Sequence, residues 1–120
     1  MKRLLMIAHG SRNESSNEEV RLLGAHVAAS LALNVDEVSV AFLELASPTI
    51  GEAFDDCFNR GAEEVVVLPY FLAGGAHVVR DIPGAIEAVT RRWSDKKIRL
   101  LPHIGASEAM ASLIVQAYNR

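Results

Sequence analysis

The fold is decided by the stretch VVVLPYFLAGGAHVVRDIP, residues 65–83. It begins with a β-branched, apolar run that stops at Pro69, which is typical of an interior strand in a parallel sheet covered on both faces. An apolar loop follows and carries one histidine, His77. Because ligands of open α/β sheets bind beyond the carboxyl ends of the strands, residues 70–77 are predicted to lie where chemistry takes place.

This loop contains two adjacent glycines, Gly74 and Gly75. They allow backbone conformations and a close approach that a side chain would forbid. Asp81 and Pro83 then suit the first turn of a helix, the aspartate as a cap or dipole partner and the proline through its preset φ. The stretch therefore predicts a strand, a ligand-binding loop and a helix in succession.

The same alternation extends outward over the whole chain. Further short apolar runs predict strands at residues 4–8, 38–42 and 98–101. Apolar residues spaced by three and four predict helices with the stripes Val20, Leu23, Val27 and Leu31; Ile50, Phe54, Cys57 and Phe58; Ile86, Val89 and Trp93; and Met110, Leu113 and Ile114. The order β-α-β-α-β-α-β-α predicts an α/β fold with a four-stranded parallel sheet and helices on both faces.

Helix ends can also be predicted. The first helix is expected over about residues 16–33, with its end at Asn34. Ser47 and Pro48 resemble an N-cap and first-turn pair for the second helix, which Gly61 stops. The last helix is expected to be capped near Ser107 and to bury its apolar stripe.

Composition limits the function classes. A chain of 120 residues with 50% hydrophobic and 22% charged residues predicts one globular domain, residues 1–120. A net charge of −3 leaves no basic footprint for nucleic acid. Cys57 is the only cysteine, so we expect a core residue, no intrachain disulfide and a reducing compartment. The apolar run 4–8 is too short for a signal peptide, and no stretch approaches a membrane span, so a soluble cytoplasmic protein is expected.

Four strand ends carry polar side chains: His9, Glu44, His77 and His103. Parallel topology places all of them on one rim of the sheet. Two imidazoles and a carboxylate form a ligand set for a divalent first-row metal, and the same groups accept protons near neutral pH. His9 and His77 lie beside glycines and look positioned, whereas His103 and the helical His26 favour structural roles.

Other residues near this rim have two interpretations each. Tyr70, Phe71 and Leu72 are either buried core or an exposed apolar floor for a ligand. Arg12 and Arg80 follow the two histidines and either bind carboxylates or phosphates of a ligand or are simply solvated. No phosphate-binding loop, dinucleotide fingerprint or nucleophile elbow is present in the sequence.

Three segments resemble the short CbiX/SirB family of class II chelatases. They are AHGSR at 8–12, AFLELASPTI at 41–50 and LPYFLAGGAHVVRDIP at 68–83, in the order and spacing of the family. The resemblance implies a single chelatase domain over residues 1–120 that is half of a chelatase-type fold. It also implies insertion of Co, Fe or Ni into sirohydrochlorin in cobalamin or siroheme biosynthesis, with no tightly bound cofactor.

The resemblance also implies site residues and a partner. His9, His77 and Glu44 fall on the metal-binding and catalytic positions, with Glu44 as either ligand or base. The predicted substrate-binding residues are Arg12, Tyr70, Phe71, Leu72, Gly74, Gly75 and Arg80. Short members of the family pair as homodimers, with the cleft between the two halves.

Two other functions compete with a chelatase. A metal or tetrapyrrole binding protein without turnover would use the same site. Histidine phosphatases also place a histidine before a glycine after the first strand, but they precede it with arginine, where this chain has Ala8. The missing phosphate clamp disfavours the phosphatase.

Overall fold

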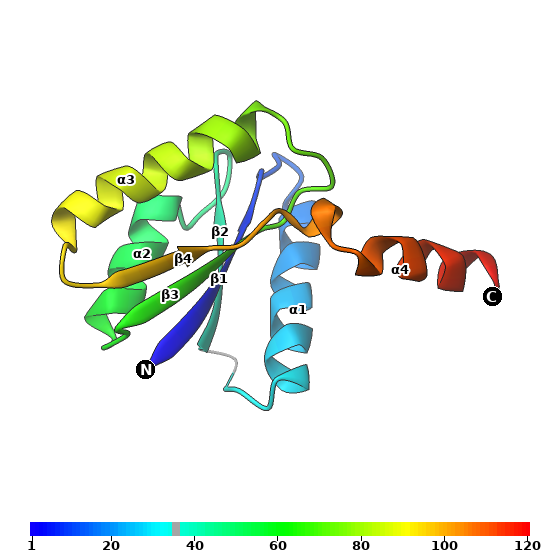
Figure 1. The fold of residues 1–120 in the computed structure, drawn as a ribbon, viewed down its shortest axis with the longest axis horizontal. Coiled ribbons are helices and arrows are strands. Elements are labelled where there is room, and N and C mark those ends of the chain that lie inside the picture. The colour runs from blue at the N-terminus through cyan, green and yellow to red at the C-terminus, as the bar shows by residue number, and fades with distance from the viewer. Residues whose placement is uncertain (35–36) are drawn as a thin grey trace.

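Four parallel strands form one sheet flanked by helices in a computed structural model, which describes residues 1–34 and 37–120 (Figure 1). The strands are β1 (Lys2–Ala8), β2 (Val38–Phe42), β3 (Glu64–Pro69) and β4 (Lys97–Leu100). The helices are α1 (Glu14–Ser30), α2 (Ile50–Asn59), α3 (Ile82–Arg92) and α4 (Ala109–Tyr118). A π-helical turn, His77–Asp81, precedes α3, and a 3-10 turn, Ile104–Ala106, precedes α4. The predicted α/β fold is confirmed.

The strand order β2-β1-β3-β4 places β1 between two partners. Ala8 at the end of β1 is in register with Phe42 of β2, and Ile7 is in register with Pro69 of β3. Three strands therefore end at the same edge of the sheet, and the loops that follow them start side by side.

Helices cover both faces of the sheet, as predicted (Figure 1). On one face, Leu5 and Val67 of the strands pack with Phe54 and Cys57 of α2, and all four are fully buried. α3 completes this cluster. The face opposite carries a smaller cluster in which Met6 and Val38 of the strands contact Ala28 of α1. Cys57 is thus a core residue, as expected from the sequence.

Several helix ends differ from the sequence prediction. Thr49, not Ser47, caps α2: its hydroxyl accepts from the backbone N–H of Glu52, whose carboxylate accepts from the N–H of Thr49. Gly61 ends α2 as predicted, with φ +98°. α1 ends at Ser30, before Asn34.

The buried face of α1 is also shifted from the predicted stripe. Asn17, Gly24 and Ala28 are buried, whereas Leu31 at the end of the stripe is exposed. Gly24 and Ala28 have small side chains, so α1 can pack closely on the sheet. Leucines at these positions would hold α1 further from β2. A Cβ on Gly24 would lie 3.0 Å from Val40.

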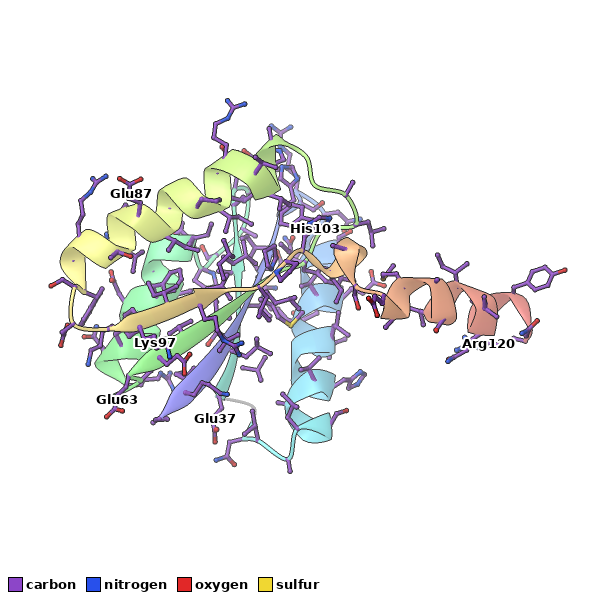
Figure 2. All side chains as sticks on the ribbon, viewed as in Figure 1. Glu37, Glu63, Glu87, Lys97, His103 and Arg120 are labelled. Carbon is purple, nitrogen blue, oxygen red and sulfur yellow. The ribbon has the colours of Figure 1, made fainter. Side chains whose placement is uncertain are left out.

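The last helix does not bury its apolar stripe, so that prediction is wrong. No residue of α4 is buried, and Leu113 and Ile114 are exposed. After the 3-10 turn the chain leaves the sheet, and α4 projects away from the other helices (Figure 1). Figure 2 shows its side chains standing clear of the body as far as Arg120. Ser107 does cap the helix, because its hydroxyl accepts from the N–H of Ala109.

Within the part of the chain that the structure describes, no helix combines the length and apolarity needed to cross a bilayer.

Candidate functional site

The loops after β1 and β2 are joined by their backbones. Leu43 donates its N–H to the carbonyl of Ala8, and Glu44 donates to the carbonyl of His9. Gly10 makes this approach possible, because it has φ +95° and a Cβ there would lie 1.8 Å from the carbonyl oxygen of Glu44. The local sequence therefore fixes His9 and Glu44 beside each other.

The side chains of His9 and Glu44 meet in front of these loops. Nε2 of His9 lies 3.2 Å from Oε1 of Glu44, and both side chains are about half exposed. The imidazole and the carboxylate thus lie within ion-pair distance of each other and are open to solvent. An imidazole and a carboxylate are both groups that can act as a general base toward a bound molecule.

His77 arrives from the loop after β3 and completes the group. Its ring centroid lies 4.7 Å from that of His9. Its Nδ1–H donates to Oδ2 of Asp81 at 2.8 Å. Asp81 stands at the start of α3, as predicted, but its side chain makes no capping hydrogen bond and instead orients His77. Because Nδ1 is engaged, a metal would reach His77 at Nε2.

Asn17 holds the loop that carries His9, a role that the sequence did not reveal. It is 2% exposed. Its Oδ1 accepts from the N–H of Ser11 at 2.9 Å, and its Nδ2 donates to the carbonyl of Ser11 at 2.8 Å. Asn17 is thus a polar residue on the buried face of α1. A polar residue at a buried position of a helix could have indicated this role, but only once the helix was known to begin at Glu14.

A charged cluster surrounds this clamp. Glu14 accepts hydrogen bonds from Arg21 and from Asn17, and these hold the pKa of the Glu14 carboxyl below its ordinary value. The guanidinium of Arg21 also lies over the ring of Phe42, 5.2 Å from its centroid. The start of α1 is therefore pinned to the end of β2.

The three apolar residues after β3 behave differently from one another. Phe71 packs against the core, with its ring 6.5 Å from that of His77. Leu72 is 74% exposed. Tyr70 is partly exposed and lines a hollow of about 210 Å³ together with His9 and Asn17. Only Tyr70 and Leu72 can form the exposed apolar floor.

The two glycines of this loop do not adopt the backbone conformations that only glycine allows. Neither Gly74 nor Gly75 has a positive φ. A Cβ on Gly74 would lie 3.2 Å from the ring of His103, whereas one on Gly75 would meet nothing within 4 Å. Close approach is therefore required at Gly74 alone, and His103 packs under the loop.

Arg12 and Arg80 lie on the loop after β1 and on the π-helical turn, respectively, and both are exposed. The ion pairs found in the described residues involve neither of them. Their guanidinium groups are available to an anionic ligand.

The predicted metal ligands are close but not arranged as a ready-made site. Over residues 1–34 and 37–120, no three His, Cys, Asp or Glu side chains gather closely enough to hold a metal ion. Nε2 of His9 faces Oε1 of Glu44 at 3.2 Å, which leaves no room for a metal ion between them. The group is suited to transient binding of a metal and to proton transfer.

Comparisons with known proteins show which family the chain is similar to. The sequence model of the CbiX family matches residues 3–120. Sirohydrochlorin ferrochelatase of Priestia megaterium is 30% identical over 119 residues, which are 99% of this chain and 44% of the relative. Sirohydrochlorin cobaltochelatase of Methanopyrus kandleri is 34% identical over 95 residues, 79% of this chain and 64% of the relative. SirB from Bacillus subtilis, solved with Fe³⁺, superposes with a TM-score of 0.84 at 30% identity.

The chain is shorter than these proteins. The superposition on SirB covers 96% of this chain and 45% of that one, and the first relative is matched over a similar share. The chain therefore spans about half the length of these two proteins.

Proposed function

The chain belongs to the CbiX family, and from this membership we propose that it inserts a divalent metal ion into sirohydrochlorin in cobalamin or siroheme biosynthesis. Residues 1–120 act as a single chelatase domain. The metal, Fe, Co or Ni, is a substrate of the reaction, and the protein needs no tightly bound cofactor. The named activities of the relatives support this assignment.

One observation carries the proposal. Three separate loops bring His9, Glu44 and His77 together at the carboxyl edge of the sheet, with 3.2 Å between the first two and 4.7 Å between the imidazole rings. Two imidazoles and a carboxylate bind first-row divalent ions, and ligands of such folds bind at this edge.

The chemistry of insertion fits this group. Two pyrrole N–H protons must leave while metal–water bonds are exchanged for metal–pyrrole bonds. His9 and His77 hold the metal through neutral nitrogens, and Glu44 accepts a proton or adds a ligand. A loosely assembled and exposed set is an advantage, because the metal has to leave with the product.

The surroundings of the group suit a flat, acidic tetrapyrrole. The exposed Tyr70 and Leu72 provide apolar surface for the macrocycle, and the close packing at Gly74 keeps their loop near the sheet edge. Arg12 and Arg80 are placed to meet its carboxylates. Phe71 supports His77 from the core side.

We further infer that two copies form a homodimer whose cleft holds the tetrapyrrole. Half the length of SirB leaves room for a second unit of the same size. We also place the protein in the cytoplasm, because its one cysteine, Cys57, is buried and unpaired, as is usual in a reducing compartment.

The test is anaerobic absorbance spectroscopy of sirohydrochlorin with Fe(II), Co(II) or Ni(II) and catalytic amounts of protein. We expect many turnovers per protein, lost in His9→Ala and His77→Ala and kept in the matched control His26→Ala, which alters an exposed histidine of α1. Full rates in both site variants would contradict the assignment. Conversion that stops at one ligand per site would identify a carrier instead.

A further inference from the structure

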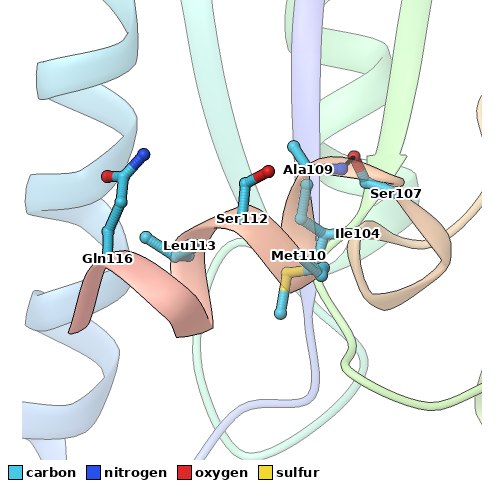
Figure 3. Close-up of a pocket in the computed structure, with 7 residues that line it drawn as sticks. All are labelled: Ile104, Ser107, Ala109, Met110, Ser112, Leu113 and Gln116. Atoms are coloured by element: carbon cyan, nitrogen blue, oxygen red, sulfur yellow. Dashed lines mark hydrogen bonds between the residues drawn. The ribbon is translucent and has the colours of Figure 1, made fainter. Parts of the chain in front are cut away.

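Charged side chains are unevenly distributed around the candidate site. The hollow beside α4, about 340 Å³ in volume, is lined by uncharged residues such as Ile104 and Gln116 (Figure 3). The hollow that contains His9 is bordered instead by the first turns of α1, where Arg21 and Glu14 form an ion pair. A charged pair at the start of α1 can therefore influence the site, although neither of its residues lines the hollow.

The guanidinium of Arg21 contacts three separate segments of the chain. One nitrogen, Nη1, donates to the carboxylate of Glu14 on α1. The other, Nη2, donates to the backbone carbonyl of Ser47 at 3.1 Å, and the group also lies over the ring of Phe42 at the end of β2. A planar, forked guanidinium is suited to making several such contacts at once. Arg21 therefore joins α1 to β2 and to the loop that carries Glu44.

The loop after β2 is strained at Leu45, the residue that follows Glu44. Leu45 has φ +66°, and in the described part of the chain Ala32 is the other non-glycine residue with a positive φ. Such a conformation costs free energy for a residue with a side chain, and it persists only where the surrounding contacts hold it. The Leu45 side chain is 51% exposed, so its burial does little to offset this cost. The loop therefore has to be held by its neighbours.

Hydrogen bonds hold the loop on each side of Leu45. Before it, Glu44 donates its N–H to the carbonyl of His9 at 3.1 Å. After it, the carbonyl of Ser47 accepts from Arg21. Arg21 thus contributes a side-chain contact that holds the far end of the strained loop.

The same arginine is linked to the loop that carries His9. Glu14, which accepts from Arg21, also accepts from Nδ2 of Asn17 at 3.1 Å. Asn17 in turn binds both backbone groups of Ser11, two residues after His9. The hydrogen bond to Glu14 also raises the pKa of Arg21 above its ordinary value, so the arginine stays charged. A continuous chain of hydrogen bonds therefore runs from one loop to the other.

We propose that Arg21 is a positioning residue for metal insertion, which holds the loops after β1 and β2 together and so keeps the carboxylate of Glu44 3.2 Å from His9. Without Arg21 the strained loop can relax, and Glu44 moves away from the metal and the pyrrole N–H groups. Arg21 does not line the hollow that contains His9, so its effect is exerted through Glu44. This role rests on the function proposed above.

A double-mutant cycle tests whether Arg21 acts through Glu44. Arg21→Met removes the donors but keeps an unbranched side chain that can pack on Phe42. We expect it to lower kcat for metal insertion about 10-fold or more with KM for sirohydrochlorin unchanged, and to have no further effect in a Glu44→Gln background. An equal loss in both backgrounds would overturn the proposal. The matched control is Arg91→Met, which removes an exposed arginine paired with Glu87 on α3 and should leave kcat unaltered.

Hydrogen exchange gives a second test that needs no turnover. In Arg21→Met, the N–H of Glu44 should exchange several-fold faster than in the wild type, whereas the N–H of Leu5 in β1 should keep its rate. Unchanged exchange at Glu44 would mean an undisturbed loop, and faster exchange at both positions would mean a general loss of stability; either result would overturn the proposal. A wild type that inserts no metal, but whose Glu44 N–H depends on Arg21 in this way, would contradict the proposed function and not the positioning of Glu44.

Discussion

The orientation of His77 depends on one carboxylate four residues further along the chain. Asp81 accepts the Nδ1–H of His77 at 2.8 Å and so fixes which nitrogen faces the site. We expect Asp81→Asn to lower the metal insertion rate about 10- to 100-fold, because the amide holds the ring with a weaker bond. Initial rates measured against metal concentration would check this.

The matched control for this change is Asp56→Asn. Asp56 also pairs with a residue four positions on, Arg60, but on α2 away from the rim. Its substitution should leave the rate unaltered. Equal rates for the two variants would mean that Asp81 does not position His77.

Gly10 carries the strictest backbone requirement of the site. An alanine there would need φ +95° and would place its Cβ 1.8 Å from the carbonyl oxygen of Glu44. We expect Gly10→Ala to lower the free energy of unfolding by at least about 1 kcal/mol and to separate His9 from Glu44, with loss of insertion. Thermal unfolding and initial rates measure the two effects.

A second glycine gives the control of opposite sign. Gly84 lies in α3, and a Cβ there meets nothing within 4 Å. Gly84→Ala should raise the free energy of unfolding by up to about 1 kcal/mol, since alanine is the better helix former.

A stable and active Gly10→Ala variant would show that the β1 and β2 loops can rearrange.

At the scale of elements, α2 and α3 are joined through Asp55. Its carboxylate accepts from Nε1 of Trp93 at 2.8 Å and from Nη2 of Arg92 at 3.0 Å. These bonds, the Trp93 bond foremost, hold the pKa of Asp55 below its ordinary value. The contact therefore stabilises the fold above the unfolded-state pKa and is lost as the pH falls through the lower folded-state value.

The pH dependence follows from this sign. Asp55→Asn should unfold at a lower temperature than the wild type near pH 7, and the difference should shrink below about pH 4. Fluorescence of Trp93, the only tryptophan, follows the transition. Asp95→Asn, an exposed control, should show no such trend. If the difference in unfolding temperature between the wild type and Asp55→Asn stays constant with pH, the charge on Asp55 does not stabilise the fold.

The sequence predicted the presence of the helices and strands correctly. It was less reliable on where the helices begin and end and on which of their residues are buried. The apolar runs at β1, β2 and β3 predicted those strands because a buried parallel strand has few polar positions. The cap at Thr49 was missed because Ser47 satisfies the same local rule. The stripe of α4 was misassigned because periodicity indicates an apolar face but not the surface that covers it.

At the scale of the whole molecule, topology accounts for what could be predicted about the site. Parallel strands that end at one edge had to bring His9, Glu44 and His77 near one another, and the structure places them so. The contacts of Asp81 and Asn17 could not be predicted, because each depends on a turn geometry that residue types do not specify. The metal-binding roles remain predictions.

Two copies sharing a cleft also imply that activity depends on protein concentration. In the homodimer proposed above the two copies share the cleft, so a separated copy has an open site and binds the tetrapyrrole poorly. We expect the insertion rate per protein to fall on dilution in parallel with the loss of dimer measured by sedimentation. Trp93 fluorescence at each concentration should stay native, which separates dissociation from unfolding. A rate per protein that stays constant while the dimer dissociates would mean that one copy is a complete enzyme.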